Sequence, residues 1–228
     1  DERAAAEAAG EALVGLVLLG DISEHGRAEE LAAARDLLDL GPVPVVVGVG
    51  NHDASDASAP QFNRAFGPGN LAFSICSLRV AQLDSGDAAL APSIEARLPE
   101  LLDRGDARFH LVATHYPPYA GRTGGGWASE RQAERLLVEA AIQGSDAVLA
   151  GHVHDIMAFP AIPVGDRRVR EYIVGTGGAD QGAGLPRYGY LRLRFAGRME
   201  ACFVEVPPAG ADGPLQAAPD GVPACVTP

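Results

Sequence analysis

The sequence contains no lysine, so all 18 of its basic side chains are arginine. Its 30 acidic residues outnumber them and leave a formal net charge of −12 at pH 7. Nucleic acids and anionic membrane surfaces are bound by basic surface, so this balance argues against both as partners. It does not argue against a small phosphorylated substrate, whose charge metal ions can meet locally.

Long apolar runs are also absent. The longest, such as VPVVVGVG, match the length of a β-strand and fall short of the ~20 residues of a membrane helix, so we expect no membrane span. Methionine occurs only at Met157 and Met199, and residue 1 is aspartate. We therefore expect the sequence to be part of a longer translation product, from which a leader could have been removed.

Cysteine is scarce, and the three residues show no metal-binding spacing. Cys76 lies in an apolar run and is predicted to be a small core residue. Cys202 and Cys225 could pair and tie down the end of the chain, but the sequence alone leaves their state open. Such a pair, with a processed N-terminus, would favour export, although the compartment stays unknown.

Helix-like and strand-like segments alternate through most of the chain. Apolar periodicity predicts helices at 2–14, 27–39, 60–67, 93–105 and 129–144, with strands at 16–20, 43–49, 71–84 (a pair), 109–115 and 147–152. Three further strands without intervening helices follow at 168–178, 188–195 and 199–206. This order predicts one α/β domain over residues 1–206, a sandwich rather than a doubly wound sheet, followed by a Pro/Ala/Gly-rich tail at 207–228.

Four of the predicted core strands end in the same kind of side chain. The ends read Gly20-Asp21, Gly50-Asn51-His52-Asp53, His115 and Gly151-His152-Val153-His154, and they contain four of the six histidines. In open α/β sheets, functional residues gather at the carboxyl ends of strands. Imidazole and carboxylate groups without thiolate suit zinc, manganese or iron.

Each strand end has a plainer explanation when taken alone. Gly-Asp and Asn-His-Asp are common in turns, and a lone histidine is usually structural. The four together, in one order and separated by helical segments, indicate a metal centre instead.

The four blocks GDISE, GNHD, VATH and GHVH resemble, in this order, those of the calcineurin-like metallophosphoesterases. VATH followed by YPPY is most similar to the purple acid phosphatase side of that superfamily. The resemblance extends over about residues 15–195 and implies a four-layer αββα sandwich of two mixed sheets. It also implies a centre of two divalent or trivalent ions (manganese, iron or zinc) acting on a small phosphorylated substrate.

The resemblance assigns a role to six residues of the blocks. Asp21 resembles the ligand that bridges the two metals, and His154 resembles a ligand of the first. Asn51, His115 and His152 resemble the ligands of the second metal. His52 resembles the imidazole that faces the phosphoryl group and acts as general acid.

Two departures from the family pattern stand out. The D-x-H block, expected before the first helix, is absent and should lie upstream of residue 1; Asp1 is a poor substitute, because no histidine follows it. Where the purple enzymes have a tyrosine ligand, this chain has Glu24, so their tyrosinate colour should be missing. GDISEHG aligns instead with the GDYVDRG of Ser/Thr phosphatases, in which case Glu24 would orient His52 and His25 would hold phosphate. A solvated loop is the alternative for Glu24 and His25.

The sequence thus predicts a metal-dependent phosphoester hydrolase that uses two metals and a bridging hydroxide, with His52 as general acid. The alternative is a non-catalytic phosphate-binding or scaffold member of the same fold, motivated by the missing first block. Metal storage fits less well, because the histidines lie at strand ends rather than in a tract. Monoesterase and diesterase activity are not distinguished, and the oligomeric state is not predicted.

Overall fold

The computed structural model describes residues 2–54, 59–119, 126–179, 188–206 and 222–225. Helices are α1 Glu2–Ala8, α2 Ala28–Leu37, α3 Ala59–Phe66, α4 Pro92–Ala96, α5 Leu98–Leu101 and α6 Glu130–Ile142. Strands are β1 Leu16–Leu18, β2 Val45–Val47, β3 Leu71–Ile75, β4 Leu78–Gln82, β5 Phe109–Ala113, β6 Ala147–Ala150, β7 Ile156–Val164, β8 Arg167–Val174, β9 Gly189–Phe195 and β10 Met199–Glu205.

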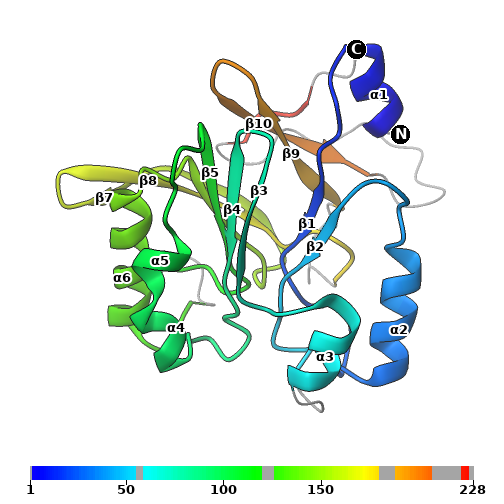
Figure 1. The fold of residues 1–228 in the computed structure, drawn as a ribbon, viewed down its shortest axis with the longest axis horizontal. Helices are drawn as coiled ribbons and strands as arrows, with labels where there is room; N and C mark the ends of the chain where they lie inside the picture. The colour runs from blue at the N-terminus through cyan, green and yellow to red at the C-terminus, as the bar shows by residue number, and fades with distance from the viewer. Residues whose placement is uncertain (1, 55–58, 120–125, 180–187, 207–221, 226–228) are drawn as a thin grey trace.

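The strands form one mixed sheet and two strand pairs (Figure 1). The six-stranded sheet has the order β3-β4-β5-β6-β8-β7, in which β4, β5, β6 and β8 are parallel and the two edge strands antiparallel to their neighbours. β1 and β2 form a parallel pair, and β9 and β10 an antiparallel one. The strands that precede the four predicted metal-binding blocks, β1, β2, β5 and β6, are therefore each parallel to a neighbour. Their carboxyl ends lie at common edges of the sheets.

Three hydrophobic clusters define the layers of the fold. Helices α4, α5 and α6 pack on one face of the six-stranded sheet, where Leu98 and Leu136 belong to the same cluster as Val112 and Val148. The β9–β10 pair covers the other face through residues such as Phe203. Helices α2 and α3 pack in turn on the β1–β2 pair. The predicted αββα arrangement of mixed sheets and flanking helices is confirmed.

Two local predictions were incomplete or wrong. Strand β7 was not predicted, because Pro160 and Pro163 interrupt its sequence; it is an edge strand, where proline is tolerated, and its pairing with β8 shifts register between Phe159 and Ile162. Cys76 is exposed, not a core residue. It occupies the turn between β3 and β4 with φ of 51°, so its side chain does not follow the alternation of the strand.

The end of the described chain is fastened to β10. Cys202 and Cys225 form a disulfide, Ala224 bridges to Phe203, and Val222 is 1% exposed. The rest of the predicted tail, residues 207–221 and 226–228, lies outside the described residues. Among the described helices, none combines the length and apolar character needed to cross a bilayer.

Glu171 is a buried carboxyl group on the strand next to the β7 edge of the six-stranded sheet. It lies on β8, is 0% exposed, and accepts the backbone N–H of Tyr119 with one oxygen, while its Oε1 has no partner among the described residues. Burial raises the pKa of Glu171 to about 8. The carboxyl group is therefore protonated in the folded protein at neutral pH.

This buried carboxyl predicts a pH-dependent stability that Glu171→Gln should remove. Between pH 4.5, its usual pKa, and about 8, the unfolded chain has lost the proton that the folded chain retains, so rising pH destabilises the native protein. Relative to the native protein, the free energy of unfolding of the variant should rise by at most ~1.4 kcal/mol per pH unit across this window. Urea unfolding in the presence of a chelator measures the difference. Glu134→Gln, at an exposed position of α6, is the control and should give no such slope.

Candidate metal centre

The side chains that follow four strands converge on one point of the fold. Asp21 follows β1, Asn51 follows β2, His115 follows β5 and His152 follows β6. His115 Nε2 lies 3.2 Å from Asp21 Oδ2 and 3.0 Å from Asn51 Oδ1, and the same Asn51 oxygen lies 3.0 Å from His152 Nδ1. Asp21, His115 and His152 form the metal-capable group found among the described residues, with ligand atoms all within 4.8 Å of one another.

Close backbone approach makes this convergence geometrically demanding. A Cβ on Gly20 would lie 2.6 Å from the nitrogen of Gly50 and 2.7 Å from His115 Nδ1, and a Cβ on Gly50 would lie 2.1 Å from Asp21 Oδ1. Gly20 has φ of 98°, which glycine adopts without strain. Asp21 and His152 have φ of 56° and 61°, so two of the converging residues are held in a conformation that non-glycine residues seldom adopt.

Asp53 fastens the loop that carries Asp21. Its carboxylate is 0% exposed and accepts hydrogen bonds from the N–H groups of Asp21, Ile22, Ser23 and Gly50 and from the Ser23 hydroxyl. Burial raises the pKa of Asp53, and these donors oppose that rise by stabilising the charged form. The sequence predicts that Asp53 fixes its loop rather than taking part in the chemistry, and its contacts show that it joins the loops after β1 and β2.

The protonation pattern of the cluster fits a cation. The carbonyl oxygen of Leu19 lies 2.7 Å from His115 Nδ1 and can only accept, so Nδ1 carries a proton and Nε2 is the ring atom that faces the other groups of the cluster. Nε2 lies 3.2 Å from Oδ2 of Asp21, and a contact this short requires either a proton or a metal ion between the two atoms. A ring nitrogen held by a main-chain carbonyl is also the usual arrangement of metal-binding histidines.

The charge states of the other groups agree with this pattern. Burial acts to raise the pKa of Asp21, but its contact with His115 and the N–H of His52 outweigh burial and lower that pKa. Burial, reinforced by His115, lowers the pKa of His152. A carboxylate and a neutral imidazole are the forms that bind metal ions.

His52 lies beside the cluster without belonging to it. Its backbone N–H donates to Asp21 Oδ1 at 3.0 Å, while its ring is partly exposed. The ring Nδ1 lies 3.1 Å from the carbonyl oxygen of Glu24 and 3.8 Å from the Glu24 carboxylate. His25 lies next along the loop, and its backbone N–H donates to Glu30.

The structure places His154 differently from the other expected ligands. His154 lies two positions beyond His152 and is exposed. It is not part of the three-residue group described above. Its role as a ligand of a first metal remains a prediction.

One residue missed by the sequence analysis supports the cluster from beneath. Ser85, fully buried, accepts the backbone N–H groups of His115 and Tyr116 on its hydroxyl, at 3.0 and 3.1 Å. It follows β4 in the sequence Asp84-Ser85-Gly86, at the carboxyl end of another parallel strand. That position was the signal that could have identified it.

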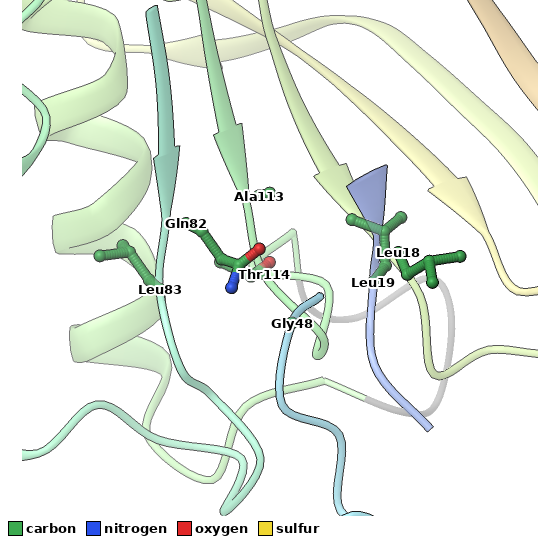
Figure 2. A pocket seen from close by; sticks show the side chains of 7 residues that line it. All are labelled: Leu18, Leu19, Gly48, Gln82, Leu83, Ala113 and Thr114. Atoms are coloured by element: carbon green, nitrogen blue, oxygen red, sulfur yellow. The ribbon is translucent and has the colours of Figure 1, made fainter. Parts of the chain in front are cut away.

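Below the cluster the two sheets meet along a packed seam (Figure 2). Gln82 of β4 donates from Nε2 to the carbonyl oxygen of Val47 in β2 at 2.7 Å and so links the six-stranded sheet to the β1–β2 pair. The gap is lined by Leu18, Leu19, Gly48, Gln82, Leu83, Ala113 and Thr114. It is too narrow for a water molecule, so it positions strands rather than holding a ligand.

The model of one protein family, calcineurin-like phosphoesterase, matches residues 11–155, well over half of the chain. The chain belongs to the calcineurin-like phosphoesterase family. All four converging residues lie within the matched region. No curated protein sequence matches the chain significantly.

Two solved structures show the same fold for this calcineurin-like chain. The purple acid phosphatase PPD1 from yellow lupin (Lupinus luteus) seeds superposes with a TM-score of 0.66 at 13% identity, covering 89% of this chain and 46% of the lupin chain. GAP50, the anchor in the inner membrane complex of Plasmodium, gives 0.60 at 15% identity, covering 84% of this chain and 74% of the other. The chain thus spans about half the length of the lupin enzyme, and the likeness extends to the fold alone.

The contact between Gly50 and Asp21 predicts that Gly50→Ala abolishes tight metal binding. The added methyl group would displace the Asp21 carboxylate or its backbone, both within 2.4 Å of it. Metal content after dialysis should fall at least tenfold. Gly197→Ala is the matched control, because a Cβ there meets nothing within 4 Å. Equal metal content in both variants would contradict the close contact.

Proposed function

We propose that this protein is a metal-dependent phosphoester hydrolase. The observation that carries the proposal is the convergence of His115 Nε2 and Asp21 Oδ2, 3.2 Å apart, with Asn51 and His152 beside them, on the fold of the calcineurin-like family. Asp21, Asn51, His115 and His152 would hold the metal, and His154 would serve a second ion. Oxygen and imidazole donors without thiolate fit manganese, iron or zinc.

The residues of the chain divide the chemical work between them. Metal ions bound there would supply Lewis-acid stabilisation of the phosphoryl oxygens and activation of water. Asp21 has one oxygen facing His115 and the other accepting the N–H of His52, which ties the position of the general acid to that of the ligand.

His52 is proposed as the group that protonates the leaving oxygen. Because the Glu24 carbonyl oxygen can only accept, His52 Nδ1 carries a proton in that contact, which leaves Nε2 as the atom for proton transfer. The main chain of Glu24 therefore orients the ring, and its side-chain carboxylate, 73% exposed, assists from a longer distance. His25 is proposed to lie where phosphate binds.

A non-catalytic, phosphate-binding member of the family is the second candidate. It is favoured by the exposure of His154 and by a cluster that contains the ligands expected for one metal. The structural likeness to GAP50, an anchor protein, is compatible with it.

Comparison of His52→Ala with His115→Ala tests the enzymatic proposal. His52→Ala should lower turnover of an aryl phosphate or an aryl phosphodiester by ~10²–10⁴-fold and retain its metal. His115→Ala should lose metal and activity together. Assays with added manganese, zinc or iron, and elemental analysis of the same samples, measure both quantities. Bound metal without turnover of either ester in the unaltered protein would favour the non-catalytic candidate, and absence of both would refute the proposal.

A further inference from the structure

The aromatic ring of Tyr116 lies against one of the expected metal ligands. Its centroid is 3.9 Å from that of the His152 imidazole, with an interplanar angle of 31°. His115 meets both rings edge-on, at 5.3 Å from Tyr116 and 5.2 Å from His152. The three rings therefore form one packed group, in which Tyr116 covers a face of His152.

The two histidines are oriented by different contacts. A main-chain carbonyl, that of Leu19, fixes the ring of His115 through Nδ1. The backbone of His152 has φ of 61° in the short loop after β6, and a face of its ring packs against Tyr116. The stacked phenol ring restricts rotation of the imidazole about its side-chain bonds, as a hydrogen bond does for His115.

Tyr116 is itself held by buried groups on three segments. Its N–H donates to Ser85 after β4, and its carbonyl oxygen accepts from Thr114 Oγ1 at 2.9 Å and from Trp127 Nε1 at 2.8 Å. Ser85, Thr114 and Trp127 are 0%, 2% and 5% exposed. A residue anchored in this way can impose an orientation on its neighbour rather than adapt to it.

The phenol remains neutral in this position. A neutral phenol contributes its ring face, which attracts positive charge. An imidazole that binds a metal ion becomes more positive, so the stack should be stronger in the metal-loaded protein than in the free one.

We propose that Tyr116 is the positioning residue of His152, and that stacking of its ring sets the affinity of the centre for metal. This inference rests on the proposed metal-dependent function. It concerns binding rather than turnover, so the two can fail separately.

Two substitutions of Tyr116 test the inference: one keeps an aromatic ring and the other removes it. Tyr116→Phe should bind Mn²⁺ or Zn²⁺ like the unaltered protein, whereas Tyr116→Leu should bind about tenfold more weakly, as expected for loss of a partly desolvated cation–π contact. Isothermal titration calorimetry of the full chain measures the dissociation constants. Tyr119→Leu removes a ring from the same loop, one that packs on Phe159 instead, and should bind like the unaltered protein.

A spectroscopic signal keeps the test independent of whether the leucine variant folds. Metal binding should perturb the near-ultraviolet absorption of tyrosine in the unaltered protein, and Tyr116→Phe should lose that perturbation while still binding metal. Thermal melts report folding of each variant.

The outcomes separate the inference from the proposed function. Equal affinity in folded Tyr116→Leu, or a full tyrosine signal in Tyr116→Phe, would overturn the inference and leave the function standing. The expected affinities without ester hydrolysis would support the inference and overturn the enzymatic proposal. No metal binding by the unaltered protein would overturn both.

Discussion

The buried carboxylate of Asp53 is the interaction on which the rest of the centre depends. It is fully enclosed, yet it accepts five hydrogen bonds from groups on the loops after β1 and β2. A buried charge without such donors would destabilise the fold by several kcal/mol. Neither loop can therefore move away from Asp53 without a loss of stability. Through this one side chain, Asp21 and Asn51 are kept in a fixed relation although β1 and β2 contribute only three paired residues each.

The same constraint explains the backbone strain and the glycines around the cluster. Because Asp53 holds the loops after β1 and β2 close together, Asp21 adopts φ of 56°. Its side chain then lies directly against the Cα of Gly50. Strain of this kind persists only where surrounding contacts over-determine it. On the opposite side of the cluster, Ser85 performs a comparable task for the loop after β5, so both halves of the centre are fastened by buried polar side chains rather than by the ligands themselves.

The sequence predicts well which side chains converge, because their positions follow a topological rule. Asp21, Asn51, His115 and His152 come directly after strands that are parallel to a neighbour, and such ends meet at one edge. The supporting residues follow no comparable pattern: Ser85 and Gln82 matter through partners 30 and 35 positions away. Strand β7 escaped prediction for a different reason, since an edge strand can contain Pro160 and Pro163 without losing hydrogen bonds that matter to the sheet.

The converging oxygen and nitrogen atoms of the cluster, in a chain of strongly negative charge, suit a cation. His115 Nε2 lies 3.2 Å from Asp21 Oδ2 and 3.0 Å from Asn51 Oδ1, and the same Asn51 oxygen lies 3.0 Å from His152 Nδ1, so one positive charge placed among them would meet several acceptor atoms. A bound metal ion would be a common partner for these oxygen and nitrogen atoms. The net charge of −12 attracts cations to the surface generally, and each carboxylate oxygen has two lone pairs. Asp21 Oδ1 can therefore accept the N–H of His52 and keep a lone pair for a cation, so this hydrogen bond is compatible with the proposed roles of both residues.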